Sequence, residues 1–124
     1  MKMVVAIVQP QQLPALKKAL FESNIQHMTC TNVLGTAPEG AQIKIFRGVP
    51  HAVTLAQKVR VELAVNDDVV DKTVEALAKG ARDSGGFGMI FVTNIVQVLN
   101  VREGTEGKEA LNPKAEPKLK EEPR

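Results

Sequence analysis

The chain has 124 residues, of which 44% are apolar and 24% are charged. This length is enough for one hydrophobic core and too short for two stable cores, so we expect a single domain. The chain contains four Phe and neither Trp nor Tyr, so its core must be aliphatic. The formal net charge of +2 comes from interspersed cations and anions, which argues against nucleic acid as a partner.

The cysteine content and the N-terminus favour a cytoplasmic protein. A single cysteine, Cys30, excludes an internal disulfide and is compatible with a reducing compartment. We interpret it as a small buried hydrophobe on a strand. The apolar stretch at the N-terminus stops at Gln9-Pro10, short of a signal-peptide core or a membrane span.

The first half of the chain predicts a strand, a helix and a second strand. Lys2–Val8 is a short β-branched run closed by a proline, typical of a strand buried on both faces. Leucines at helical spacing, with a proline where the first turn tolerates it, predict a helix from Pro14 to about Asn24. Met28–Leu34 predicts a strand that ends before Gly35.

A long connection and three further elements follow. Residues 36–55 hold two prolines and two glycines, and a connection of this length is functional or disordered. Strict alternation predicts a strand over Lys58–Val65 with one buried face, and Asn66–Asp68 supplies N-cap side chains for a helix that ends near Arg82. A glycine-rich turn over residues 83–88 leads into a predicted strand over Met89–Val101.

This order, β-α-β-β-α-β, predicts an α+β fold, a ferredoxin-like two-layer sandwich over residues 1–106. The helices cover one face of such a sheet, and the other face commonly drives oligomerisation. After Arg102 the composition changes to Pro, Lys and Glu. We therefore expect residues 107–124 to form a disordered tail, because they cannot bury enough apolar surface to offset the entropy of ordering.

The predicted elements and three short motifs together resemble the PII signal-transduction family, the nitrogen regulatory proteins P-II. The motifs are Ile45-Phe46-Arg47-Gly48, Lys58-Val59-Arg60-Val61-Glu62 and Asp67-Asp68. The resemblance implies a homotrimer with ATP in the clefts between subunits. It also implies an effector loop, the T-loop, over residues 36–55 that docks onto a membrane transporter or a regulatory enzyme.

The resemblance also assigns candidate binding residues. In the effector loop, Glu39 offers an oxygen for Mg²⁺, Arg47 belongs to the family's loop motif, and His51 replaces the tyrosine that some relatives uridylylate. Lys58 matches the anchor for 2-oxoglutarate. The adenosine side of the cleft is assigned to Ile7, Thr29, Gly35, Glu62 and Ala64, and the phosphate turn to Gly86 and Gly88.

Two of the three cations expected around the phosphates are missing. Met89 stands where the family has a phosphate-binding lysine, and Asn100 and Arg102 stand where it has two arginines. Each charge-assisted contact contributes roughly 1.5 to 3 kcal/mol, so this loss should weaken triphosphate binding by about two to four orders of magnitude. We therefore expect ADP or AMP as a better ligand than ATP with Mg²⁺.

Structural alternatives stand beside these assignments. The glycine turn could cradle phosphate or could be a plain helix C-cap, Met89 could pack against an apolar neighbour, and Lys58 could lie on the wet face of its strand. His27, Cys30 and His51 contain the atoms of a metal site without a recognised zinc spacing, so no metal site is predicted.

No nucleophile-base-orienter set is present, which argues against an enzyme. Two rival functions remain. One is a ligand-free trimeric scaffold for protein interactions, and the other is a metal-tolerance trimer of the same fold.

Overall fold

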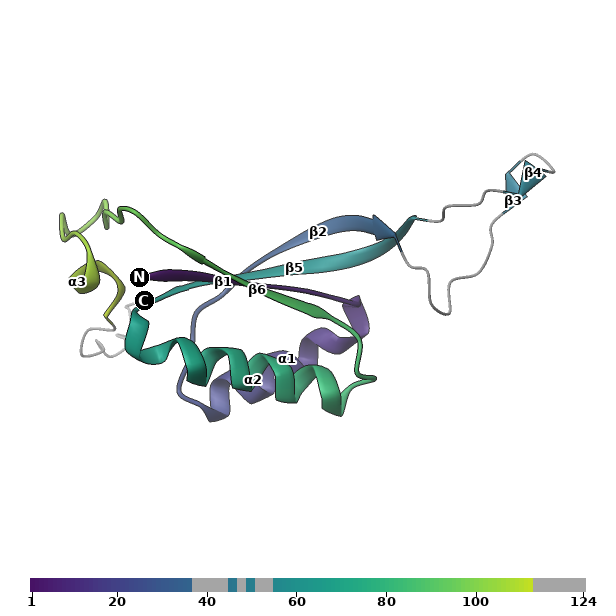
Figure 1. Ribbon diagram of the computed structural model, residues 1–124, viewed down its shortest axis with the longest axis horizontal. Helices are drawn as coiled ribbons and strands as arrows, with labels where there is room; N and C mark the ends of the chain where they lie inside the picture. The colour runs from purple at the N-terminus through teal and green to yellow at the C-terminus, as the bar shows by residue number, and fades with distance from the viewer. Residues whose placement is uncertain (37–44, 47–48, 51–54, 113–124) are drawn as a thin grey trace, which may run out of the picture.

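The protein is described by a computed structural model that covers residues 1–36, 45–46, 49–50 and 55–112. Two helices pack on one face of a four-stranded sheet with the strand order β2-β5-β1-β6 (Figure 1). The elements are β1 (Lys2–Val8), η1 (Pro10–Gln12), α1 (Leu13–Glu22), β2 (Thr29–Thr36), β3 (Ile45–Phe46), β4 (Val49–Pro50), β5 (Leu55–Val65), η2 (Asp67–Val69), α2 (Val70–Asp83), β6 (Met89–Asn94) and α3 (Lys108–Leu111).

This architecture confirms the predicted ferredoxin-like sandwich. All neighbouring strands of the main sheet pair antiparallel, and β5 and β1 occupy its centre. The alternation predicted over Lys58–Val65 is confirmed as well: every second side chain there is buried against the helices, and those between are half-exposed on the other face. The buried set of β5 is Val59, Val61, Leu63 and Val65.

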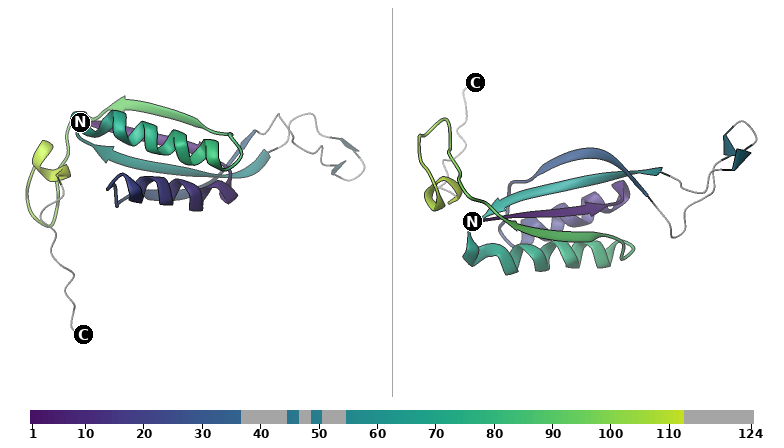
Figure 2. Two further views of the ribbon diagram at one scale, coloured as in Figure 1. Left: turned by 90° about the horizontal axis from the view of Figure 1, so that it is seen from below. Right: turned by 45° about the horizontal axis from the view of Figure 1, so that its top comes forward.

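The helices lie side by side under the sheet (Figure 2) and enclose an aliphatic core. Leu16 and Leu77 are fully buried in this core. The two helices approach closely at Gly80, where a Cβ atom would lie 2.8 Å from the Leu16 Cα. Only glycine permits this approach, because any side chain there would have to push the helices apart.

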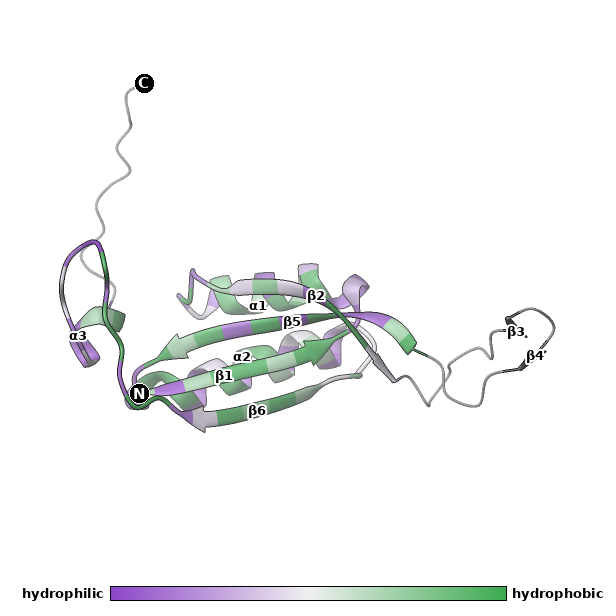
Figure 3. Ribbon diagram, turned by 90° about the horizontal axis from the view of Figure 1, so that it is seen from above, coloured by the Kyte–Doolittle hydropathy of each residue, from purple (hydrophilic) through white to green (hydrophobic). Residues whose placement is uncertain are grey.

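The opposite face of the sheet has no helix over it (Figure 3). We call it the open face, and it carries Met3, Val5 and Ile7 of β1 together with their cross-strand partners. Val5 is buried there, but Met89 and Phe91 on the edge strand β6 are 63% and 48% exposed. The prediction that β1 is buried on both faces therefore holds only in part, because Met3 and Ile7 remain half-exposed in the single chain.

Strand β6 is shorter than predicted, since it ends at Asn94 and not at Val101. It pairs with β1 until Asn94 lies opposite Lys2, and the Ile95 N–H then donates to the Met1 carbonyl. Beyond that point β1 offers no further backbone partner. The apolar residues that follow instead turn back in a short hairpin, which we call the C-terminal hairpin (residues 95–107), where Leu99 pairs with Glu106.

Residues 107–112 also differ from the prediction of a disordered tail. They include the short helix α3, and the Gly107 N–H donates to the Val98 carbonyl at 3.0 Å, within normal hydrogen-bond range. The side chain of Asn66 anchors this segment by donating to the Lys108 carbonyl at 3.1 Å and to Asn112 Oδ1 at 2.8 Å. Residues 113–124 lie outside the described part of the chain.

Three smaller predictions also need correction or extension. Cys30 is exposed and is not a buried hydrophobe, because β2 is an edge strand whose side chains are mostly exposed. Asn66 does not cap the following helix through its side chain: its Oδ1 accepts no hydrogen bond, and its Nδ2 donates to residues 108 and 112. The β2–β5 hairpin extends to Thr36 and Leu55, and the short strands β3 and β4 pair with each other between them.

In the part of the chain that the structure describes, no helix is both long and apolar enough to cross a bilayer.

Candidate functional site

The glycine turn after α2 forms a helix C-cap. Gly85 and Gly86 have φ angles of +116° and +82°, a conformation that side chains with a Cβ rarely adopt. The Gly86 N–H donates to the Ala81 carbonyl at 2.7 Å, which is the long-range bond of a Schellman motif. The plain structural alternative therefore accounts for the Gly86 amide, which is already engaged within the turn.

A buried glutamine that the sequence analysis did not single out supports this turn. Gln12 has no exposed surface, and its Nε2 donates to the Phe87 carbonyl at 2.8 Å and to the Ala81 carbonyl at 3.3 Å. Its Oε1 accepts a hydrogen bond from the Gln9 N–H at 2.8 Å. One side chain thus ties the entry of α1 to the glycine turn, although a Gln that follows Gln9 and Gln11 in a polar stretch gives no sign of burial in the sequence.

The turn packs directly on the end of β1. Gly88 has a φ of +141°, and a Cβ there would lie 3.2 Å from Val8 Cγ1 and 3.4 Å from the Ile7 carbonyl oxygen. Met89 follows as the cross-strand partner of Ile7. Ile7, Gly86, Gly88 and Met89 therefore lie together, and we call this set the glycine-turn end. Met89 is largely exposed, so within one chain it does not pack in an apolar environment.

Gly35 and Lys58 lie in the β2–β5 hairpin. The Lys58 Nζ donates to the Thr36 carbonyl oxygen at 2.8 Å. A Cβ at Gly35 would lie 3.3 Å from Lys58 Cδ, so the glycine leaves room for the lysine stem. The ammonium of Lys58, predicted to bind an anion, thus closes the base of the connection between β2 and β5 in the single chain.

Thr29, Glu62 and Ala64 lie on the open face nearer the other end of the sheet. Thr29 is the cross-strand partner of Glu62, and Ala64 is opposite Met3. The Glu62 carboxylate accepts a hydrogen bond from Arg60 Nε at 2.7 Å, and both side chains are partly exposed. This ion pair leaves a polar strip on an open face that is otherwise largely apolar.

Arg102 lies at the turn of the C-terminal hairpin, and Asn100 shapes that turn. The Asn100 N–H donates to the Thr105 carbonyl at 2.8 Å, and its carbonyl accepts from the Gly104 N–H at 2.7 Å. Its Oδ1 accepts from the Glu103 N–H at 3.1 Å. The residue that replaces an expected arginine therefore has a local structural role, because its short side chain stabilises the turn.

The predicted nucleotide residues therefore fall into two groups within one chain. The glycine-turn end lies where β6 begins, whereas Arg102 lies in the hairpin beyond the point where β6 ends. Figure 1 shows the α2–β6 turn and the α3 region at opposite ends of the sheet. A single chain does not bring Gly86 and Gly88 next to Arg102, so it does not build the predicted cleft alone.

Electrostatic effects are strongest at the start of η2 and the end of α2. A hydrogen bond of 2.7 Å from the N-terminal ammonium holds the pKa of Asp67 below its usual value. The hydrogen bond from Lys79, also 2.7 Å, lowers the pKa of Asp83 and raises that of Lys79. These carboxyls are exposed, so each pair contributes little to stability.

Three candidate residues of the effector loop, Glu39, Arg47 and His51, lie outside the described residues. Among the residues that are described, His, Cys, Asp and Glu side chains form no group of three that could hold a metal ion. Of the three residues that contain the atoms of a metal site, His27 and Cys30 are exposed, and His51 lies outside the described residues.

Comparisons with known proteins place the chain in a family. The family model "Nitrogen regulatory protein P-II" matches residues 1–105. The chain is 38% identical to nitrogen regulatory protein P-II of Rhizobium etli over 112 residues, which cover 90% of this chain and 100% of that protein. It is 32% identical to nitrogen regulatory protein GlnK1 of Methanosarcina mazei over 114 residues, covering 90% and 97% of the two chains. The chain therefore belongs to the P-II family of nitrogen regulatory signal-transduction proteins.

Proposed function

We propose that this protein is a cytoplasmic, non-enzymatic regulator that forms a homotrimer and binds an adenine nucleotide, ADP or AMP, between neighbouring subunits. The bound ligand controls how the segment between Thr36 and Leu55 docks onto a membrane transporter or an enzyme. A ligand can exert this control only if it binds one state of the protein better than another.

The observation that supports this proposal is the division of the site between two ends of the sheet. Gly88 and Met89 lie at one end, and Arg102 lies beyond the other. A neighbour whose hairpin reached the glycine-turn end would complete the set. The exposed Met89 and Phe91 on the open face give such neighbours an apolar surface to bury, and P-II proteins are trimeric.

The cations of the site favour a ligand with few phosphates. Met89 supplies no charge, and Asn100 uses its side-chain oxygen within the hairpin turn. The Gly86 amide is engaged in the helix cap. Arg102 therefore remains as the cation of the predicted phosphate site, and a triphosphate would lack partners for most of its charge.

Isothermal titration with ATP, ADP, AMP and cyclic nucleotides tests the ligand class. We expect ADP or AMP to bind more tightly than ATP. The M89K and N100R double variant should gain at least tenfold in ATP affinity, because one restored charge-assisted contact corresponds to about 1.5 kcal/mol or more. M89K alone controls for damage to the Asn100 turn.

Tight ATP binding by the native protein with Mg²⁺ and 2-oxoglutarate would contradict the proposed ligand class. An unchanged ATP affinity in both variants would contradict the placement of the cleft. A stable monomer in solution, measured by sedimentation, would contradict the proposal as a whole.

A second function, a ligand-free trimeric scaffold, is favoured by the local hydrogen bonds of Gly86 and Asn100. Both groups would face phosphate in the predicted cleft, and both are satisfied within their own turns. Absence of any heat in the nucleotide titrations, with partner binding insensitive to metabolites, would favour this function. Mass spectrometry of small molecules that co-purify with the native oligomer separates the two functions directly.

A further inference from the structure

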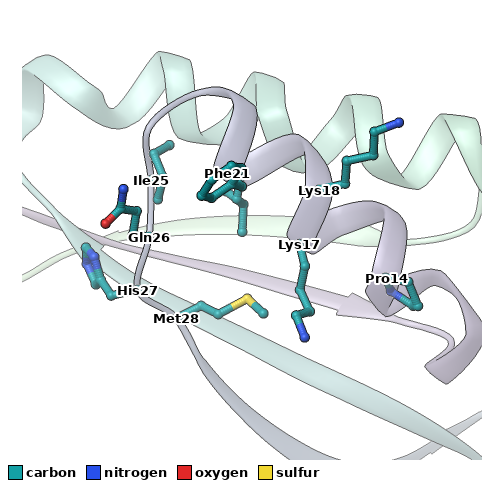
Figure 4. Close-up of a pocket in the computed structure, with 9 residues that line it drawn as sticks. Pro14, Lys17, Lys18, Phe21, Ile25, Gln26, His27 and Met28 are labelled. Carbon is teal, nitrogen blue, oxygen red and sulfur yellow. The ribbon is translucent and has the colours of Figure 1, made fainter. Parts of the chain in front are cut away.

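A groove lies beside α1, between that helix and the segment that leads to β2 (Figure 4). Its volume is about 680 Å³, within the range of sites that bind small ligands or the side chains of a partner. Leu20, Ile25 and Met28 are among its lining residues, and Leu20 and Ile25 also belong to the hydrophobic core. The floor of the groove is therefore apolar and continuous with the hydrophobic core.

An exposed aromatic side chain stands in this groove. Phe21 is 68% exposed, although the chain has only four Phe and no other large aromatic residue. An aromatic ring contributes more to binding than most side chains when a partner covers it. An exposed ring above an apolar hollow is therefore typical of an interaction surface.

The charged residues that line the groove have one sign. Lys17 and Lys18 line it, and no Asp or Glu does. Figure 4 shows the two lysines extending in opposite directions, with the Lys17 chain beside Met28. Lys18 interacts electrostatically with Asp83, which forms its ion pair with Lys79. Among the described residues, neither Lys17 nor Lys18 forms an ion pair with a neighbour. An occupant with acidic residues on both sides of an apolar stripe would match this arrangement.

The shape of the groove favours a helical occupant. Pro14, Lys17 and Phe21 follow one another at spacings of three and four residues along α1, which forms a ridge of the kind that packs against another helix. The groove lies on the helix layer, whereas the exposed Met89 and Phe91 lie on strand β6 of the sheet. Copies that join through the open face would thus leave the groove accessible.

From these observations we propose that the groove docks an acidic amphipathic helix of a partner protein. Apolar residues on one stripe of that helix would cover Phe21 and fill the hollow over Met28. Its flanking carboxylates would pair with Lys17 and Lys18. This surface lies outside the connection between β2 and β5, so it would act as a second contact with a partner and does not depend on nucleotide binding.

The test uses the native full-length protein and two labelled 18-residue peptides of identical composition. One peptide places leucines on a single helical stripe with glutamates on both flanks, and the other has the same residues scrambled. Fluorescence anisotropy should show saturable binding of the amphipathic peptide and at least tenfold weaker binding of the scrambled one. Binding should also weaken as salt rises, because exposed ion pairs are screened.

Three variants localise the contact. The double change K17E and K18E should weaken binding of the acidic peptide about tenfold and remove most of its salt dependence. F21S should also weaken binding at least tenfold, and circular dichroism should show an unchanged fold because the ring is exposed. K72E, an exposed lysine on α2, is the matched control and should bind like the native protein.

Equal binding of both peptides, or unchanged binding by F21S, would overturn the proposal. Loss of the native oligomer in F21S would also overturn it, since that result would identify a second copy of this chain as the occupant of the groove.

Discussion

The two ends of the sheet are each held by one buried side-chain amide, but the amides are satisfied to different degrees. Gln12 fixes the glycine-turn end, and its nitrogen and its oxygen both have partners. Asn66 fixes α3 behind the C-terminal hairpin, and its nitrogen donates twice while its oxygen has no partner. Asn66 is only 6% exposed, so water reaches that oxygen poorly.

The two halves of the proposed cleft therefore differ in how firmly the fold holds them. A fully paired buried amide stabilises the structure around it, whereas an unpaired buried oxygen carries a desolvation cost that offsets part of the gain. We therefore expect the glycine turn to be the more firmly fixed of the two ends. Four predictions test this comparison.

The largest effect is expected for Gln12→Ala. The substitution leaves the Phe87 and Ala81 carbonyls and the Gln9 N–H without this partner and opens a cavity behind the turn. We expect the free energy of unfolding to fall by about 3 kcal/mol in urea denaturation. Gln11→Ala, which removes one exposed hydrogen bond to Gln9, is the control and should change stability by less than about 0.5 kcal/mol. Equal losses of stability in the two variants would show that Gln12 does not support the glycine turn.

A pair of glycine substitutions distinguishes backbone strain from crowding at the same end. Gly88→Ala and Gly86→Ala both place a Cβ on a residue with positive φ, but only the one at position 88 would meet Val8 and Ile7. We expect losses of about 2 kcal/mol for Gly88→Ala and about 1 kcal/mol for Gly86→Ala in the same denaturation experiment. A smaller loss at position 88 would show that the turn can move away from β1.

A moderate effect is expected for Asn66→Ala, which removes both hydrogen bonds to residues 108 and 112. The unfolding free energy should fall by only about 1 kcal/mol, since the substitution also removes an unpaired oxygen. Amide hydrogen exchange over residues 98–112 should nevertheless rise strongly. Exposed Asn32→Ala on β2 is the control. Unchanged exchange in this segment would show that Asn66 does not hold α3.

The smallest effect is expected for Asp67→Asn, next to Asn66. The N-terminal ammonium holds the pKa of Asp67 below its ordinary value of 3.8, so the charged carboxylate favours the folded state. Its contribution should be present above pH 3.8 and should disappear as the pH falls through the lowered pKa. Thermal unfolding should therefore show a small excess in Tm of the native protein over Asp67→Asn at pH 5 to 7. That excess should shrink as the pH falls below 3.8, and an excess that did not depend on pH would exclude this ion pair as its cause.

Sequence patterns predicted the elements whose burial is periodic. The alternation through Val59, Val61 and Leu63 gave the correct buried face of β5, and the leucine spacing gave α1. The end of β6 could not be found in this way, because the apolar run continues to Val101 while the pairing with β1 stops at Lys2. The length of a strand depends on its partner, and the run alone does not show where that partner begins.

The arrangement of the candidate site was predicted only in part. The resemblance assigned Gly86, Gly88 and Arg102 to one cleft between subunits, which stays a prediction. The predicted strand over Met89–Val101 already separated Gly88 from Arg102. The fold adds that β6 is shorter and that Arg102 lies in a hairpin beyond its end. The supporting amides of Gln12 and Asn66 were missed because both lie in short polar stretches, and polar residues are usually exposed. Asn66 was predicted to cap a helix because its short amide can reach nearby backbone groups. The same short reach allows it to hydrogen-bond the backbone of α3.

The proposed cleft, divided between the two ends of β6, would link ligand occupancy to mass action among the subunits. Because each chain carries both the glycine-turn end and the hairpin with Arg102, a closed ring of chains contains as many complete clefts as chains, and a lone chain contains none. Dilution would then release nucleotide as it dissociates the ring, and excess nucleotide would in turn protect the ring against dilution.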